Sequence, residues 1–409
     1  MRKRDNIVVG LDIGTTKVCA LVAEVTEDNR IKIAGIGTSP SKGLRKGAVV
    51  NIEDTVASIR NAVRKAEQMA GVEIKGVYTG IAGGHINGLN SRGMVAIKNQ
   101  DVTMADIDRA IEAARAVAIP PDREILHVIP QEFIVDGQDG IKNPLGISGV
   151  RLEVQVHIIT GAITSVQNIV KSINKAGLEV LDIILQPLAS SEAVLTPDEK
   201  DLGVVLVDIG GGTTDMAIFV NGAVSHTAVI PIGGNHLTND IAVGLRTPTA
   251  EAERIKTLYG CALPSLVKEN APIEVSSMGG RPPRLLSRQM ITEIIEPRVE
   301  EIFDHVAKEI KKVNYADMLS SGIVLTGGSC TMEGIVDMAE RVTGMPVRRG
   351  IPTNIEGISD TLSHPMYSTG IGIILCALQE QGMNERKFKN GHLFENIYHR
   401  MKSWFGGFF

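Results

Sequence analysis

The chain has 409 residues, of which 43% are hydrophobic and 22% are charged, and its formal net charge is −5. This length is typical of roughly two to four compact units, and the composition excludes a chain that is disordered throughout. The negative charge argues against a general nucleic-acid-binding protein, which needs a basic surface to displace counterions from phosphates.

The N-terminus is charged from Met1 to Asp5 and then enters an apolar strand that is too short for a signal peptide. No stretch approaches the roughly 20 apolar residues of a membrane-spanning helix. The apolar run Ile371–Leu378 is brief and predicts a buried helix. The cysteines are far apart and form no C-x-x-C pair, which indicates reduced core thiols in a cytosolic protein. They are Cys19, Cys261, Cys330 and Cys376.

Residues 8–25 (VVGLDIGTTKVCALVAEV) place two apolar runs around Asp-Ile-Gly-Thr-Thr, which predicts a strand, a tight turn and a second strand. A third strand is expected at Ile31–Gly37. Helical and strand patterns then alternate, which favours an α/β architecture. Helices are expected at 54–70, 104–116 and 164–176, and strands at 77–82, 125–135, 151–160 and 180–185.

Residues 204–222 (VVLVDIGGGTTDMAIFVNG) repeat the first pattern, and a further strand is expected at Ala228–Ile232. Two copies of one strand–hairpin–strand unit, about half a chain apart, indicate two similar subdomains that face each other. Helices are expected at 249–259, 287–313 and 333–343, a strand at 322–326, and a polar linker at 382–392.

The two hairpin turns have the composition of a phosphate cradle. Glycine lets backbone N–H donors approach a phosphate closely, and the turns supply Gly14, Gly210, Gly211 and Gly212. Thr15, Thr16, Thr213 and Thr214 add hydroxyl donors, and Lys17 adds a positive charge. Asp12 and Asp208 are candidates to hold Mg²⁺ through its water shell, because Mg²⁺ gives up water reluctantly.

Three further segments complete a candidate nucleotide site. Gly327, Gly328 and Ser329 follow a predicted strand, where their backbone can pass close to a ribose or base. Glu253 and Lys256 share one helix face and can bracket an adenosine, and Gly234 lies in another turn. Each segment alone has a simpler interpretation: a hairpin turn, a solvated ion pair or a strand-to-helix turn. The combination is specific, and no P-loop or dinucleotide fingerprint competes with it.

With these motifs the chain resembles the superfamily of actin, the sugar kinases and the heat-shock chaperone ATPases, in which two facing subdomains carry two phosphate hairpins and an adenosine motif. The resemblance implies that Asp12–Lys17 and Asp208–Asp215 are the phosphate motifs and that Gly327–Ser329 is the adenosine motif. It also implies that Gln186, which lies between the hairpins, positions the attacking water. The alternative is a polar residue at a strand end.

Longer strings narrow the resemblance to the FtsA family of cell-division proteins: HVIPQEFIVDGQDGIKNPLGISGVRLEVQVHIIT (127–160), GGRPPR (279–284), IIEPR (294–298) and PMYSTGIGI (365–373). The likeness covers nearly the whole chain. It implies an actin-like (ribonuclease H-like), two-lobed α/β ATPase fold. The implied units are a first subdomain over 1–83, completed by 163–198 and 358–381; an insertion over 84–162; a second core subdomain over 199–230 and 306–357; a small subdomain over 231–305; a linker over 382–392; and an amphipathic helix over 393–409.

The same resemblance implies partners. The small subdomain over 231–305 would dock the C-terminal peptide of FtsZ, the tubulin-like ring protein, and would help to bind adenosine. The insertion would contact other subunits in filaments and other division proteins. The FtsZ peptide is partly acidic, and matching charge is available from Arg281, Arg284, Arg288 and Arg298. The alternative for each is an ordinary surface arginine. No nucleic-acid partner is expected.

The last 17 residues (LFENIYHRMKSWFGGFF) predict an amphipathic helix. Six of the 14 aromatic residues of the chain, including the only tryptophan, lie in its last 16 residues. An aromatic face beside basic residues is typical of a helix that lies in the interface of an anionic membrane. The alternative is a helix that docks on the protein's own core. The residues predicted to contact the membrane are Leu393, Phe394, Ile397, Tyr398, Arg400, Met401, Lys402, Trp404 and Phe405.

The resulting prediction is a filament-forming adaptor that binds ATP and Mg²⁺ and anchors the FtsZ ring to the cytoplasmic face of the bacterial inner membrane at the division site. We expect at most a slow ATPase, in which the nucleotide acts mainly as a conformational ligand. Two alternatives remain open. One is a small-molecule kinase of the same superfamily, and the other is an actin-like scaffold of the pilus-assembly type, for which this basic aromatic tail is not expected.

Overall fold

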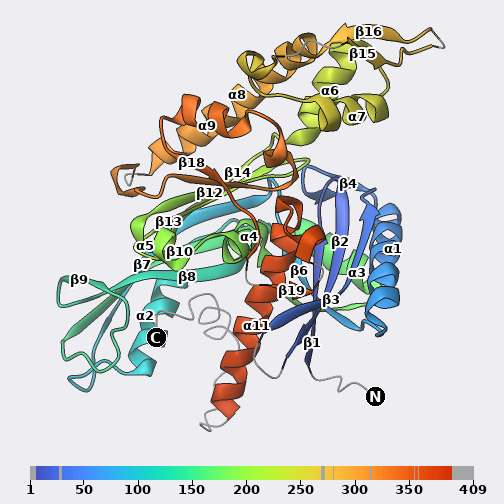
Figure 1. The fold of residues 1–409 in the computed structure, drawn as a ribbon. Coiled ribbons are helices and arrows are strands. Elements are labelled where there is room, and N and C mark those ends of the chain that lie inside the picture. Colours follow the sequence, from blue (N-terminus) through green and yellow to red (C-terminus); the bar gives the residue numbers. More distant parts are fainter. Residues whose placement is uncertain are drawn as a thin grey trace.

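The protein was analysed as a computed structural model that describes residues 6–26, 30–268, 272–279, 281–313, 316–353, 355–357 and 359–388. Two large sheets and a smaller third sheet organise this part of the chain (Figure 1). The predicted amphipathic helix over 393–409 lies outside the described residues. All four cysteines are buried, and none forms a disulfide.

The first sheet has six strands in the order β11-β6-β1-β2-β3-β19. In β1 and β2, apolar residues form nearly continuous buried runs because helices cover both faces of the sheet. α1 and α3 pack on one face, while α11 and α4 pack on the other. The strands are β1 (Ile7–Ile13), β2 (Lys17–Val25), β3 (Ile31–Pro40), β6 (Gly76–Ile81), β11 (Glu179–Leu185) and β19 (Glu356–Gly357); the helices are α1 (Ile52–Ala70), α3 (Ile163–Ala176), α4 (Gln186–Val194) and α11 (Ser368–Phe388).

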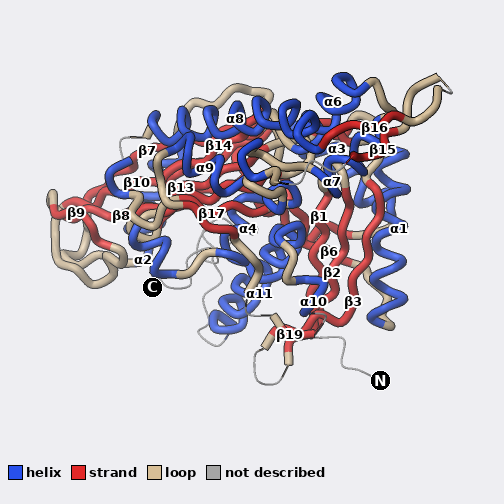
Figure 2. The backbone as a smooth tube through the Cα atoms, turned by 45° about the horizontal axis from the view of Figure 1, so that its top comes forward, coloured by secondary structure: helices blue, strands red, loops and turns tan. Residues whose placement is uncertain are grey.

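The second sheet has five strands in the order β14-β13-β12-β17-β18. Successive side chains of a strand point to opposite faces, so Val205 and Val207 of β12 enter one core and Leu206 enters the other. In Figure 2, α4 lies between the two large sheets. The elements are β12 (Val204–Ile209), β13 (Thr214–Val220), β14 (Ala223–Ile230), β17 (Ile323–Thr326), β18 (Val347–Arg349), α5 (Pro197–Leu202) and α9 (Ile335–Thr343); the short helix α10 (Ser359–Leu362) follows β19 of the first sheet.

The two sheets begin with the same arrangement, since β1–β2–β3 and β12–β13–β14 are both antiparallel meanders. The prediction of a strand at Ala228–Ile232 was wrong in its bounds. β14 starts at Ala223, directly after Asn221 and Gly222, whose positive φ angles of 53° and 83° suit a tight hairpin turn. It ends at Ile230 because Pro231 has no N–H to donate to the sheet.

The third sheet belongs to a segment inserted between β6 and α3. It has the order β7-β10-β8-β9 and a hydrophobic core of its own, with α2 packed against it. One side of this unit also contacts β14 of the second sheet. Its elements are β7 (Ile86–Ala96), α2 (Met104–Arg115), β8 (Arg123–Val135), β9 (Gln138–Ile141) and β10 (Arg151–Ala162).

A smaller unit lies above the second sheet in Figure 1. Sequence patterns did not reveal its first helix, because the Gly233–Gly234 pair at its start and Gly244 near its end are turn signals. Residues of this unit share one core with the second sheet. Its elements are α6 (Gly234–Leu245), α7 (Thr249–Tyr259), β15 (Pro272–Val275), β16 (Arg284–Ser287) and α8 (Arg288–Lys312).

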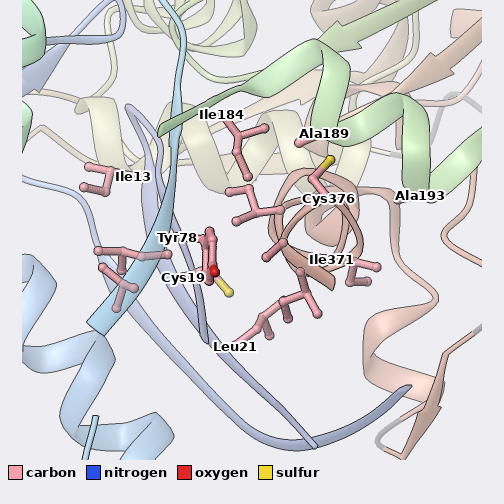
Figure 3. Packing of buried hydrophobic residues seen from close by; sticks show 14 of the residues in the cluster. Ile13, Cys19, Leu21, Tyr78, Ile184, Ala189, Ala193, Ile371 and Cys376 are labelled. Carbon is pink, nitrogen blue, oxygen red and sulfur yellow. The ribbon is translucent and has the colours of Figure 1, made fainter. Parts of the chain in front are cut away.

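α11 and α4 pack backbone against backbone beside the first sheet (Figure 3). Ile371 and Cys376 of α11 lie in one buried cluster with Leu21 and Ala189. A side chain on Gly372 would place its Cβ 1.7 Å from the carbonyl oxygen of Ala189, so only glycine permits this contact. The apolar run Ile371–Leu378 is therefore part of a buried helix, as predicted.

The prediction of a linker from residue 382 was wrong for residues 382–388, which continue α11. Glu385, Arg386 and Lys387 are good helix formers, and an existing buried helix extends more easily than a new helix starts. Residues 389–392 of the predicted linker lie outside the described residues.

Candidate functional site

The two predicted phosphate turns meet face to face. A Cβ on Gly211 would lie 1.9 Å from Thr16 Oγ1, and a Cβ on Gly212 would lie 2.5 Å from Thr15 Oγ1. Because glycine has no Cβ, the turn between β12 and β13 can approach the turn between β1 and β2 this closely. The fold thus brings together two segments that lie nearly 200 residues apart in the sequence.

Between these turns lies a cleft of about 620 Å³, which is the size of a typical small-molecule site. Nearly all of the predicted nucleotide residues line it. They are Asp12, Gly14, Thr15, Thr16, Lys17, Gln186, Asp208, Gly210, Gly211, Gly212, Thr213, Gly234, Glu253, Lys256, Gly327, Gly328 and Ser329. Thr214 does not line the cleft, since its buried hydroxyl donates a hydrogen bond to the carbonyl of Ile232 at 2.9 Å.

The polar groups of the turns are already engaged with the protein. The Lys17 ammonium donates to the carbonyl of Met366 at 2.8 Å and lies 4.1 Å from the centre of the Tyr367 ring, in a cation–π geometry. Thr15 Oγ1 accepts from the N–H of Gly47 at 3.2 Å, and Thr16 Oγ1 donates to Asn235 at 3.3 Å. These contacts hold the side chains of Thr15, Thr16 and Lys17 in the wall of the cleft.

Two carboxylates were predicted at the cleft, and both are buried there. Burial raises the pKa of Asp12 to about 6, although the charge of Lys17 opposes this shift. Burial also raises the pKa of Asp208, while hydrogen bonds from Ser190 and Thr369 act in the opposite direction. Gln186 Nε2 donates to Asp12 Oδ1 at 3.2 Å. Buried carboxylates that line one pocket favour a cation there.

A third carboxylate, Asp215, also lines the cleft; sequence reasoning placed it at the end of the second phosphate motif but gave its side chain no role. Burial and the charge of Asp208 raise its pKa to about 7. Thr213 donates to its Oδ2 at 2.8 Å, whereas its buried Oδ1 has no hydrogen-bond partner among the described residues. A signal was present in the sequence: in a tight antiparallel hairpin Asp208 pairs with Asp215, so both point to the same side.

The rest of the cleft wall is built by α6, α7 and the turn after β17, which lies directly beside Asp208. Lys256 Nζ contacts Glu253 at 2.7 Å, Thr238 Oγ1 at 2.9 Å and the carbonyl of Gly234 at 3.1 Å. This lysine is only 12% exposed, so the pair is not a freely solvated surface ion pair. Gly327 has a φ of +85°, and a Cβ there would lie 2.3 Å from Asp208 Oδ1.

The four arginines predicted to bind a partner differ in their surroundings. Arg288 lines the cleft and pairs with Glu333, and Arg284 donates to the carbonyl of Leu245. Arg298 holds Asp240 with two hydrogen bonds, at 2.7 and 3.2 Å, and also pairs with Glu301.

Arg281 is exposed, and the described part of the chain supplies no hydrogen bond or ion pair to it. The fold therefore engages three of these four arginines in internal contacts.

In the described ranges, no group of three or more His, Cys, Asp or Glu side chains is arranged to hold a metal ion by itself. In the same ranges, no helix is both long and apolar enough to cross a membrane.

Comparison with known proteins identifies the family. The family model for cell division protein FtsA matches residues 205–372, and the model for the SHS2 domain inserted in FtsA matches residues 83–160. The cell division protein FtsA of Pseudomonas aeruginosa is 52% identical over 409 residues, which cover 98% of both chains. The FtsA protein of Neisseria meningitidis serogroup B is 49% identical and covers 99% of both chains.

Solved structures confirm the actin-like fold. A chain of the PilM–PilN type IV pilus biogenesis complex aligns with a TM-score of 0.65 and 17% identity, over 90% of this chain and 97% of its own length. MreB5 of Spiroplasma citri, solved bound to ADP, aligns with a TM-score of 0.57 and 15% identity, over 95% of this chain and 100% of its own. These two likenesses concern the fold alone, whereas the sequence matches over the full length show that the chain belongs to the FtsA family of cell division proteins.

Proposed function

We propose that the chain binds ATP with Mg²⁺ in the cleft between its two lobes. The observation that carries this proposal is the meeting of the two glycine–threonine turns, with Lys17 and the three carboxylates Asp12, Asp208 and Asp215 at one end of the cleft. The turns offer backbone N–H donors and room for phosphate oxygens. The adenosine end would be formed by Glu253, Lys256 and the Gly327–Ser329 turn.

The residues fit a hydrated divalent cation. The buried oxygen of Asp215 that lacks a partner within the described ranges is available to accept from a metal-bound water. Burial raises the pKa values of Asp12 and Asp215, and a cation beside them would favour the charged carboxylates and offset that effect. Asp12 and Asp208 would face the ion, and Gln186, hydrogen-bonded to Asp12, would orient a water molecule.

In this proposal the nucleotide is mainly a conformational ligand. It contacts turns from both large sheets, so it favours one relative arrangement of the lobes through its differential affinity. Hydrolysis would be slow, and the bound nucleotide would stabilise the subunit that assembles into filaments. Self-assembly in turn would place many copies of the segment 393–409 at one membrane surface, which raises the avidity of membrane binding.

The proposed cellular role is an adaptor between the FtsZ ring and the cytoplasmic face of the membrane at the division site. Membership of the FtsA family supports the division role. The FtsZ C-terminal peptide would dock on the unit that contains β15, β16 and α8, and the inserted sheet would contact other division proteins. The basic, aromatic composition of 393–409 supports attachment to anionic lipids.

Co-pelleting with vesicles of phosphatidylglycerol and phosphatidylethanolamine tests the membrane proposal. The full chain with ATP and Mg²⁺ is compared with a chain that ends at Phe388, the last residue of α11. Two full-length variants change the segment 393–409: Trp404→Ala removes one aromatic side chain, and Arg400→Glu reverses one charge.

We expect the full chain to pellet with the vesicles, the truncated chain to stay in solution, and both point variants to pellet less. Equal pelleting of all four proteins would refute membrane attachment through this segment. Unfolding midpoints of the four proteins serve as the control, because the truncation should leave the folded lobes intact.

A further inference from the structure

Two hydroxyl groups, a buried one from Ser190 and a half-buried one from Thr369 at the edge of the cleft, converge on one oxygen of Asp208. Ser190 Oγ donates to Asp208 Oδ2 at 2.7 Å, and Thr369 Oγ1 donates to the same oxygen at 3.2 Å. The two hydroxyls also lie 3.0 Å from each other, so the three groups form a closed triangle. The other carboxylate oxygen, Oδ1, lies on the side of Gly327, which lines the cleft.

The two hydroxyls come from α4 and α11, the helices that pack against each other beside Gly372. Thr369 is in the first turn of α11, where the positive end of the helix dipole also favours a nearby carboxylate. Ser190 is in the middle of α4 and is fully buried. The backbone contact between the helices thus sets the spacing of the two donors.

The hydroxyl of Ser190 forms its hydrogen bond outside its own helix. A buried serine in a helix commonly donates to a carbonyl of its own helix. The next residue, Ser191, does so, since its hydroxyl donates to the carbonyl of Leu188 at 2.6 Å. Ser190 instead reaches across to the second sheet, where the hydrogen bond compensates for the burial of both groups.

We propose that Ser190 and Thr369 are positioning residues that hold Asp208 for the cation of a bound nucleotide. A carboxylate can rotate about its terminal bond, so that either oxygen can turn toward the cleft. With Oδ2 held by two hydroxyls, Oδ1 remains directed to the cleft, where it can accept from a metal-bound water. Outer partners of this kind tune metal affinity without touching the metal. This inference rests on the proposed binding of Mg²⁺ and nucleotide.

The test measures the affinity of the full chain for a fluorescent ATP analogue, once with Mg²⁺ and once with EDTA. Ser190→Ala and Thr369→Val each remove one hydroxyl with little change in volume. Ser191→Ala is the matched control, because it removes a buried hydroxyl that contacts only its own helix. Thr369→Ser keeps the hydroxyl and tests for rescue, and Asp208→Asn removes the charge of the residue that is being positioned.

We expect Ser190→Ala and Thr369→Val to weaken binding about tenfold in Mg²⁺, as outer partners of metal ligands do elsewhere, and to leave binding in EDTA unchanged. Ser191→Ala and Thr369→Ser should match the wild type in both conditions. In the Asp208→Asn background, Ser190→Ala should have no further effect.

Equal losses in Mg²⁺ and EDTA would show general damage to the cleft and would overturn the positioning role, as would wild-type affinity in both variants. If the wild-type chain binds the analogue equally well with and without Mg²⁺, the metal part of the proposed function fails, and this inference fails with it. If one variant does not fold, the Thr369→Val and Thr369→Ser pair or the Ser190→Ala and Ser191→Ala pair still decides the question.

Discussion

Lys17 and Met366 are 349 positions apart in the sequence, yet the ammonium of Lys17 donates to the carbonyl of Met366 at 2.8 Å. Tyr367, the next residue, lies beneath the same ammonium. Both residues directly precede α11, which starts at Ser368. The lysine that faces the proposed phosphate position is therefore held by the segment that leads into the C-terminal helix.

Lys17→Met should weaken the binding of ATP at least about tenfold, because a hydrogen bond to a charged group contributes roughly 1.5–3 kcal/mol. The binding of adenosine, which has no phosphates, should not change. Isothermal titration of both ligands measures the difference. Tyr367→Leu is the control, since it removes the ring and keeps the ammonium. An equal loss for adenosine would mean that the substitution damages the cleft in general.

Asp215→Asn should change the pH dependence of stability. The pKa of Asp215 is raised to about 7, so the folded protein keeps a proton that the unfolded chain loses near pH 4. The stability of the ligand-free protein should therefore fall as the pH rises from about 4 to about 7. The variant lacks this loss, so its free energy of unfolding at pH 8 should exceed that of the wild type by at most roughly 4 kcal/mol.

Thermal unfolding of both proteins between pH 4 and pH 8 measures this effect. His157 contributes the opposite trend, because burial lowers its pKa to about 3 and the unfolded chain takes up the proton first. Since His157 is common to both proteins, the difference between their curves isolates Asp215. Parallel curves would contradict the assigned pKa.

Gly372→Ala should separate α4 from α11. Its Cβ would lie 1.7 Å from the carbonyl oxygen of Ala189, and backbone atoms cannot move aside without shifting a helix. Overpacking of this kind costs roughly 1–3 kcal/mol or more. Gly84→Ala is the matched control, because nothing lies within 4 Å of a Cβ at that position. Chemical denaturation should show a large loss for the first variant and little change for the second; similar values would disprove the tight contact.

Arg281 and Arg298 should respond differently to replacement by alanine. Arg281 is exposed, so Arg281→Ala should leave the unfolding midpoint unchanged and weaken the binding of an acidic FtsZ peptide severalfold. Arg298 holds Asp240, so Arg298→Ala should lower stability by about 1 kcal/mol. Peptide titration at low and high salt, together with thermal unfolding, distinguishes the two effects. Unchanged peptide affinity of Arg281→Ala would exclude this arginine from the docking surface.

Several parts of the candidate site were predictable because their signals are local. An Asp-Ile-Gly turn between two apolar runs specifies a hairpin without reference to the rest of the chain, and β1–β2 and β12–β13 have the predicted form. The signals for helix ends are also local: α1 ends at Gly71, which has a left-handed conformation, as a glycine after a helical pattern predicts. The strand end at Pro231 and the helix start at Gly234 were missed, since short turns between elements carry ambiguous signals.

By itself the sequence determined the two glycine–threonine turns, the α/β alternation and the family, since these depend on neighbouring residues and on long matching strings. Only the tertiary structure decided which groups share the cleft. Thr214 turns away to Ile232, Arg288 enters, and Ser190 and Thr369 reach Asp208. The positions of Ser190 and Thr369 depend on the packing of α4 against α11, where contacts between residues far apart in the chain set each side chain's direction.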